Sequence, residues 1–194
     1  MGYFGRQYGS TAEDVAAYAN AFSAGMEASG VDVTIKHFPG LGLVDKNTDT
    51  SSGVSDDSTD AGSPSVEAFR SGIDAGAAVV MMATADYELL DPGVPAAFSE
   101  PVVTGLLRDD LGFDGVIMTD DLSAAAQVQD VDPGDRAVRA VDAGCDLVLA
   151  SASPEIIGPM ADALLARAAD DADFAAKIDA AAARVVAAKS RLAG

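Results

Sequence analysis

The sequence is poor in the two side chains that most often bind metal ions in proteins. Its 194 residues include one cysteine and one histidine. Cys145 therefore has no partner for an internal disulfide, and no cysteine cluster is available for a metal ion. Because Cys145 lies within the apolar stretch "AGCDLVLA", we expect it to be a buried small side chain.

Positive charge is also scarce. There are 12 Lys and Arg residues against 31 Asp and Glu residues, which gives a formal net charge of −19. A protein that binds nucleic acid or an anionic membrane needs a basic patch to displace counterions, so neither is expected as a partner. Many of the acids stand in helix-start and loop stretches such as "STAEDV" and "VSDDSTD", which is typical of a solvated acidic surface.

Long hydrophobic runs are absent. The longest nearly unbroken apolar stretch, from Ala75 to Ala85, is much shorter than the ~20 residues of a membrane-spanning helix. The start, "MGYFGRQYGS", has neither the basic residues nor the apolar stretch of a signal peptide, and the compartment stays open. With 49% hydrophobic residues and no Pro-rich tract, the sequence predicts a globular domain without a membrane-spanning segment.

Short apolar segments alternate with helical patterns. Four segments rich in Val, Ile, Leu and Met predict buried strands: "VDVTIKHF" (31–38), "AAVVMMAT" (77–84), "GVIMTD" (115–120) and "DLVLA" (146–150). Start and stop signals predict helices over 11–30, 63–76, 99–112, 132–144, 153–169 and 171–193, the first two opening with Thr11 and Ser63 as caps. Such an alternation predicts right-handed crossovers and a parallel sheet covered on both faces.

Two folds fit this pattern, the (β/α)8 barrel and the doubly wound open sheet. No Gly-x-Gly-x-x-Gly follows a strand, which leaves the nucleotide-binding open sheet with little support. Polar residues follow the strand ends, namely Lys36, His37, Thr84 and Asp120, at the position where a barrel builds its active site. The sequence therefore predicts an α/β fold whose four parallel strands make half of a (β/α)8 TIM-type barrel.

Asp120 is the first candidate for chemistry, because it closes the strand "GVIMTD". A carboxylate there could act as a base, a metal ligand or a nucleophile. Alternatively, Asp120 caps the following helix, a reading that Asp121 and Ser123 make plausible. An Asp-Asp pair without histidine or further acids is a weak metal signal, and no metal site is predicted.

The segment "IKHFPGLG" supplies further candidates. Lys36 and His37 end a strand, and Pro39 stops its hydrogen-bond ladder. Two long polar donors at a buried strand end need acceptors, which a bound polyol such as a sugar, or Asp120, would supply. The alternative is a histidine satisfied by backbone carbonyls. Arg6, in "FGRQYG", is another candidate donor or a surface packing residue.

These motifs resemble the bacterial β-N-acetylglucosaminidases of glycoside hydrolase family 3. "KHFPGLG" is similar to the family's Lys-His-Phe-Pro-Gly-His-Gly, "GRQYGSTAEDV" to its Arg-Ser-Phe-Gly segment, "DGVIMTDDLSAAA" to the stretch that ends in the nucleophile, and "RAVRAVDAGCDLVLA" to its last strand region. Family members place roughly half of the barrel ahead of this segment. Residues 1–194 are thus expected to be the carboxyl-terminal half of a family 3 catalytic barrel domain, with the amino-terminal half as a candidate partner.

The resemblance implies a retaining glycosidase that needs no metal or organic cofactor. Asp120 matches the nucleophile, which attacks the anomeric carbon to form a glycosyl-enzyme. Arg6, Lys36 and His37 match positions that hold the sugar hydroxyls. The expected substrate is a carbohydrate with terminal β-linked N-acetylglucosamine, such as a cell-wall fragment or a chitooligosaccharide.

The chain departs from the family in the loop that carries the acid/base group. Family members have Asp-x-His there, and the matching residues are Asn47, Thr48 and Asp49, so the catalytic histidine is missing. We expect the 42–57 loop to be mobile and Asp49 to replace the histidine, the alternative being a solvated loop aspartate. Other functions stay open: a β-glucosidase of the same family, a catalytically silent sugar-binding relative, or a structural half-barrel that pairs with another chain.

Overall fold

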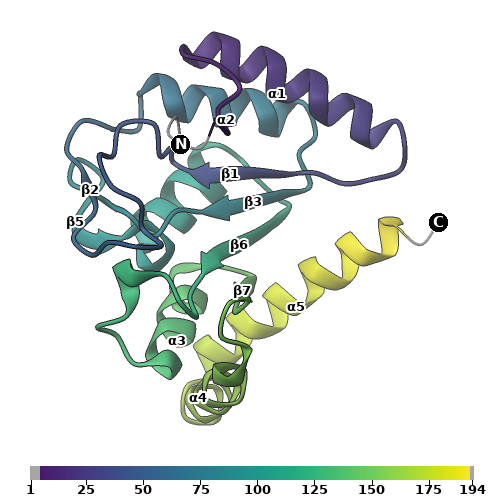
Figure 1. Ribbon diagram of the computed structural model, residues 1–194. Helices are drawn as coiled ribbons and strands as arrows, with labels where there is room; N and C mark the ends of the chain where they lie inside the picture. Colours follow the sequence, from purple (N-terminus) through teal and green to yellow (C-terminus); the bar gives the residue numbers. More distant parts are fainter. Residues whose placement is uncertain (1–4, 193–194) are drawn as a thin grey trace.

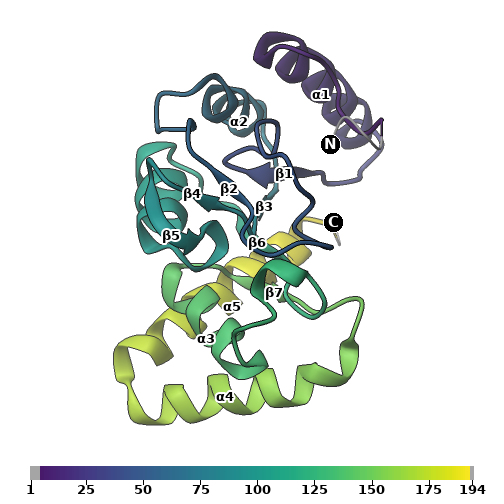
Figure 2. The ribbon, with the colours of Figure 1, turned by 60° about the vertical axis from the view of Figure 1, so that its left-hand side comes forward.

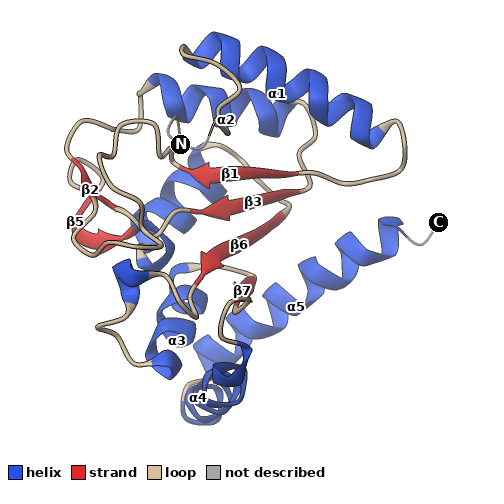
Figure 3. Cartoon of the chain, viewed as in Figure 1, coloured by secondary structure: helices blue, strands red, loops and turns tan. Residues whose placement is uncertain are grey.

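A computed structural model, which describes residues 5–192, contains a four-stranded parallel sheet. The strand order is β1 (Thr34–Phe38), β3 (Val79–Met82), β6 (Val116–Asp121) and β7 (Leu147–Leu149). All four predicted strands are confirmed, and they run in one direction (Figures 1 and 3). Because the order follows the chain, each strand lies beside the one that precedes it.

Helices separate the strands, as predicted. They are α1 (Ala12–Glu27), α2 (Pro64–Asp74), η3 (Pro101–Asp110), α3 (Pro133–Ala143), η5 (Pro154–Ile156), α4 (Ile157–Asp170) and α5 (Ala172–Leu192). Figure 2 shows α1 and α4 at opposite ends of the molecule. Consecutive parallel β/α units of this kind belong to the α/β class and match half of a (β/α)8 barrel. Within residues 5–192, no helix is long and apolar enough to cross a membrane.

Local signals explain where the helices begin, with two differences from expectation. The Thr11 hydroxyl accepts a hydrogen bond from the Asp14 N–H at 3.2 Å, as a cap should. Ser63 also precedes its helix, but its hydroxyl bonds to Asp60 at 2.9 Å and closes the preceding turn instead. The η3 helix is a π-helix, with the Leu111 N–H donating to the Leu106 carbonyl at 3.0 Å.

The core lies between the sheet and the helices that follow its strands. Val80, Met82 and Ile117 of the strands are fully buried, as is Leu107 of η3. Cys145 is buried as predicted, and burial raises the pKa of its thiol. It therefore acts as a small apolar side chain of this core.

A buried carboxylate fastens the amino-terminal end of β7 to its neighbours. The Asp146 side chain is 1% exposed and accepts hydrogen bonds from Arg108 of η3 at 2.8 Å and Arg184 of α5 at 2.9 Å. It also accepts the Ile117 N–H of β6 at 2.9 Å. These bonds join η3, β6 and α5 at the end of the sheet away from the candidate site.

A second sheet was not predicted. It consists of β2 (Ser55–Asp56), β4 (Asp86–Tyr87) and β5 (Asp91–Pro95), and it lies beyond the carboxyl ends of the main strands (Figure 1). The Tyr87 hydroxyl donates to the Gly40 carbonyl at 2.7 Å. The small sheet therefore supports the turn that follows β1.

The outer strands of the main sheet lead to a prediction about association. Within the described residues, β1 and β7 each pair with one strand of this sheet, and Tyr18 and Phe22 of α1 are exposed. Unpaired edges and exposed apolar side chains favour association. We expect the chain alone to be oligomeric or poorly soluble, and inactive, as measured by light scattering after size exclusion. A monomer that unfolds cooperatively and turns over substrate would contradict this.

Candidate active site

The site is built where the main strands end. Residues of β1 and β3 pair in register from Thr34 to Lys36, and the register then shifts before Phe38, so that His37 has no partner position. An irregularity of this kind redirects a side chain at the end of a strand. As a result, His37 Nε2 reaches across β3 to lie 3.3 Å from Asp120 Oδ2 of β6.

The environment of His37 disfavours its protonated form. The residue is 7% exposed, and this burial lowers the pKa of its imidazole. The Asp120 carboxylate and, to a smaller extent, Asp49 raise that pKa, while Lys36 and Arg6 lower it, and the net direction is down. His37 is therefore neutral at neutral pH. With Asp120 as the acceptor that faces it, we assign the proton to Nε2.

The other nitrogen of His37 decides between the two readings of this residue. Nδ1 is buried and has no hydrogen-bond partner in the protein. The alternative that backbone carbonyls satisfy the histidine is therefore wrong. Nε2 lies 3.3 Å from Asp120 Oδ2, and the expectation that Asp120 accepts hydrogen bonds from the strand-end donors stays a prediction.

Asp120 faces the pocket and does not cap a helix. The next helical turn, η4 (Ala126–Val128), has Ala125 at its cap position, so the capping alternative is wrong. Asp120 Oδ1 accepts the Asp121 N–H at 2.8 Å, and the side chain is 19% exposed. Its second oxygen is the one that faces His37.

Asp121 has a structural role. Its Oδ1 accepts the Ser123 hydroxyl, the Ser123 N–H at 2.8 Å and the Ser151 N–H at 3.1 Å, and Oδ2 accepts the Ala152 N–H at 3.1 Å. Burial alone would raise the pKa of Asp121, but these hydrogen bonds outweigh it and lower the pKa. Asp121 therefore ties the loop after β6 to the loop after β7.

One pocket brings the five predicted residues together. It has a volume of about 480 Å³, and Arg6, Lys36, His37, Asp49 and Asp120 all line it. These residues come from the segment before α1, from the end of β1, from the 42–57 loop and from the end of β6. The pocket is therefore formed by parts of the chain that are far apart in sequence.

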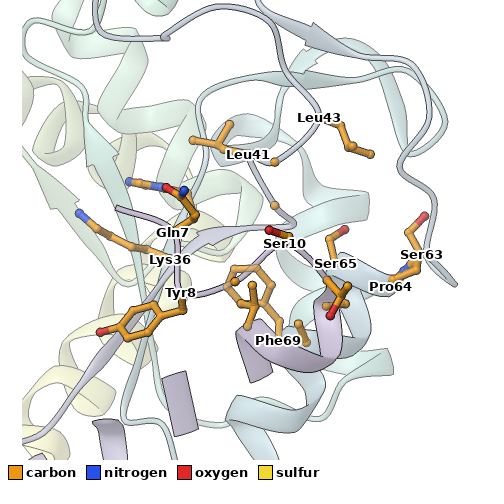
Figure 4. Close-up of a pocket in the computed structure, with 18 of the residues that line it drawn as sticks. Gln7, Tyr8, Ser10, Lys36, Leu41, Leu43, Ser63, Pro64, Ser65 and Phe69 are labelled. Carbon is orange, nitrogen blue, oxygen red and sulfur yellow. The ribbon is translucent and has the colours of Figure 1, made fainter. Parts of the chain in front are cut away.

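A second pocket adjoins the first and shares Arg6, Lys36 and His37 with it. Its volume is about 640 Å³. Figure 4 shows Leu41 and Leu43 on one side of this pocket and Tyr8 and Phe69 on the other. Asp49 and Asp120 line the first pocket and do not line this one. A ligand that reacts at Asp120 must therefore enter the first pocket.

The 42–57 loop reaches the first pocket in a defined position. The Asn47 side chain accepts the Asp49 N–H at 2.9 Å, which forms a local turn. The Thr48 carbonyl accepts the Gln127 N–H at 3.1 Å, and the Asp49 carbonyl accepts the Ala126 N–H at 3.2 Å. Mobility of this loop stays a prediction, because these bonds describe only where the loop rests.

Thr84 is the strand-end residue that does not line either pocket. It follows β3, is 1% exposed and has a hydroxyl without a hydrogen-bond partner in the protein. In the part of the chain from residue 5 to residue 192, no three His, Cys, Asp or Glu side chains are grouped so that they could hold a metal ion.

Comparisons with known proteins agree with this geometry. Residues 2–188 match the model of the glycosyl hydrolase family 3 N terminal domain. A β-N-acetylhexosaminidase of Beutenbergia cavernae, known from its crystal structure, is 59% identical, with a TM-score of 0.96 over 98% of this chain. A family 3 β-N-acetylglucosaminidase of a Paenibacillus strain is 34% identical, with a TM-score of 0.90 over 97% of this chain.

The matches cover only part of each relative. A β-hexosaminidase of Xylella fastidiosa is 39% identical over 160 residues, which are 81% of this chain and 47% of that protein. The alignments cover 56% of the Beutenbergia protein and 36% of the Paenibacillus protein. The chain therefore spans about half the length of the curated relatives it matches.

Titration of the single histidine tests the electrostatics of the site. We expect the His37 pKa, followed by NMR, to lie below the ordinary value of 6.5, and to fall further in Asp120→Asn, because the carboxylate that raises it is removed. Asp121→Asn serves as the control and should leave the His37 pKa almost unchanged.

The same lowered pKa predicts how the stability of the fold depends on pH. Since the folded pKa of His37 is lowered, His37 stabilises the fold above pH 6.5, and this contribution is lost as pH falls through the folded pKa. A His37 pKa above 6.5 would contradict the assignment.

Proposed function

Because the chain belongs to glycosyl hydrolase family 3, we propose that it carries the catalytic residues of a retaining glycosidase that releases terminal β-linked N-acetylglucosamine. The observation that carries this proposal is the contact of His37 with Asp120 at 3.3 Å in a pocket also lined by Lys36 and Arg6. Relatives named as β-hexosaminidases support the choice of sugar.

In the proposed reaction Asp120 is the nucleophile. One of its oxygens attacks the anomeric carbon of the sugar, the bond from that carbon to the leaving oxygen breaks, and an acid protonates the leaving oxygen. Water then attacks the glycosyl-enzyme, gives up a proton to the same group, and releases the sugar and the Asp120 carboxylate. Asp120 suits this role because its side chain faces the pocket and caps no helix.

The neighbours of Asp120 are proposed to bind the sugar. Arg6 and Lys36, which are exposed at the pocket, present donors that would hold its hydroxyl groups over Asp120, and the single N–H of the neutral His37, which faces Asp120, would be shared between that carboxylate and a hydroxyl group. Such contacts gain strength as positive charge develops on the sugar ring and the hydroxyls become more acidic.

Asp49 is proposed as the acid/base group. It stands at the family's histidine position and lines the same pocket as Asp120, from the loop that follows β1. A carboxylic acid is an effective proton donor at neutral pH where its surroundings, burial among them, disfavour its charged form. The exposed Asp49 therefore requires the bound substrate and the 42–57 loop to cover its carboxyl group.

We further propose that residues 1–194 form one half of a barrel domain and pair with an amino-terminal half. The relatives are about twice as long as the matched segment, and the main sheet has two outer strands.

Cell-wall fragments and chitooligosaccharides are the proposed substrates. A sugar-binding protein without turnover is the second candidate, favoured by the aspartate at the histidine position, and a β-glucosidase is the third.

Replacement of the two adjacent aspartates tests the nucleophile. In a complete barrel, Asp120→Asn should reduce turnover of a chromogenic β-N-acetylglucosaminide on the order of 10⁴-fold with little change in substrate affinity. Asp121→Asn should cost far less, because its role is to hold loops together. A fluorinated slow substrate should label Asp120. Labelling elsewhere, or a larger loss from Asp121→Asn, would remove Asp120 from this role.

Substrates with different leaving groups test Asp49. A good leaving group such as nitrophenolate needs no acid, so Asp49→Ala should slow substrates with poor leaving groups about 10²- to 10⁴-fold and nitrophenyl substrates much less. Azide should restore turnover of the nitrophenyl substrate, since it attacks the glycosyl-enzyme without a base. Equal losses on both substrates, or none, would make Asp49 a bystander and favour the sugar-binding reading.

A further inference from the structure

Gln127 contacts both ends of the segment that carries Asp49. It lies in η4, directly after the β6 strand that ends in Asp120 and Asp121, and it is 7% exposed. Its N–H donates to the Thr48 carbonyl at 3.1 Å. Its side chain bonds to Val54, 73 residues away in sequence. The stretch from Thr48 to Val54 is therefore held at its start and at its end by one residue.

The side-chain contacts of Gln127 have the geometry of a strand pair. Its Oε1 accepts the Val54 N–H at 2.8 Å, and its Nε2 donates to the Val54 carbonyl at 3.1 Å. An amide is the side-chain group that offers a donor and an acceptor side by side, so it can satisfy both polar groups of one buried residue. Val54 is 2% exposed, and Gln127 satisfies its N–H, which would otherwise be buried without this partner. The Val54 carbonyl also accepts the Asp86 N–H at 3.0 Å, and Gln127 Nε2 donates to the Asp86 side chain at 3.4 Å.

The residue is itself fixed to the end of β6. Arg136 of α3, which is 4% exposed, donates to the Leu122 carbonyl at 2.7 Å and to the Gln129 side chain at 3.2 Å. These bonds hold the segment from Leu122 to Gln129, which includes η4, against α3. Any restraint that Gln127 places on the 42–57 loop is therefore a restraint relative to Asp120.

We propose that Gln127 is a positioning residue that holds Asp49 in the pocket, over the strand end that carries His37 and Asp120. This inference rests on the proposed function in one respect: the position matters for catalysis only if Asp49 is the acid/base group. The placement of Asp49 by Gln127 can be tested without any turnover. Nothing in the local sequence "AAAQVQD" distinguishes Gln127 from its neighbour Gln129.

The single histidine reports where Asp49 lies. The charges that act on His37 are those of Asp120 and Asp49, which raise its pKa, and of Lys36 and Arg6, which lower it. The change in the His37 pKa caused by Asp49→Asn therefore measures how strongly Asp49 couples to the pocket. A loop that leaves the pocket also hydrates His37, but this effect is the same with Asp49 or Asn at position 49 and cancels in the difference.

The experiment is a double-mutant cycle on the whole chain, read as the His37 pKa by NMR. In the chain with Gln127, Asp49→Asn should lower that pKa. In Gln127→Met, which keeps the side-chain length and removes the two side-chain hydrogen bonds to Val54 and the one to Asp86, Asp49→Asn should lower the His37 pKa less or not at all. Gln129→Met is the matched control, because the Gln129 side chain bonds to Ser123, Ala125 and Arg136 and not to the loop. In this variant Arg136 still holds the segment through the carbonyls of Leu122 and Gln129.

Each outcome supports or overturns the proposal. A coupling that disappears in Gln127→Met and persists in Gln129→Met supports it. An unchanged coupling in Gln127→Met, equal losses in both glutamine variants, or no coupling in the chain with Gln127 would overturn it. If Gln127→Met does not fold, which places the His37 pKa at the ordinary 6.5 and collapses the spectrum, Gln127→Asn replaces it, since its amide is too short for Val54.

Turnover separates this proposal from the proposed function. In a complete barrel, Gln127→Met should slow substrates with poor leaving groups more than nitrophenyl substrates, with KM nearly unchanged, and so resemble a weak form of Asp49→Ala. If Asp49→Ala itself leaves turnover intact while the coupling depends on Gln127, the acid/base assignment fails and the positioning by Gln127 stands. If instead Asp49→Ala is selective for leaving groups while the coupling does not depend on Gln127, the acid/base assignment of Asp49 stands and the positioning by Gln127 fails.

Discussion

The site depends on the parallel register of the main sheet. Because parallel strands end at the same edge, β1 and β6 deliver their last side chains to one place, although His37 and Asp120 are far apart in sequence. Consecutive residues of a regular strand point to opposite faces, so Lys36 and His37 could not both face one pocket. The register shift before Phe38 removes this conflict, and both residues line the pocket while Phe38 stays in the core.

The charges of this pocket differ from those of the chain as a whole. The chain has a net charge of −19, yet the pocket is lined by the three cations Arg6, Lys36 and Lys46 beside the acids Asp45, Asp49 and Asp120. A neutral ligand with many hydroxyl groups can donate to such carboxylates and accept from such cations. An anionic ligand would meet the carboxylates unfavourably. This balance supports a carbohydrate as the ligand.

Local patterns in the sequence were sufficient for most of the fold. Strands and helices alternate, and each strand is bounded by turn residues. Because polar residues that follow parallel strands reach the same edge, the sequence could group Lys36, His37 and Asp120, and these three residues do line one pocket. The small sheet could not be predicted in this way, because β5 contains Asp91, Gly93 and Pro95, which are rare in strands. The ion pairs of Asp146 and the contact of Gln127 with Val54 depend on tertiary structure and leave no local pattern.

The exchange of histidine for aspartate gives the Gln127 contact its significance. An aspartate side chain is shorter than that of histidine, so under the proposed acid/base role of Asp49 the backbone of the loop would have to bring the carboxylate closer to the leaving group. A freely moving loop would then keep this short acid out of reach for much of the time. Bonds from Ala126 and Gln127 to the carbonyls of Asp49 and Thr48 fix this backbone relative to the strand end that carries Asp120. In the proposed mechanism, these bonds would therefore compensate in position for the shorter side chain of Asp49.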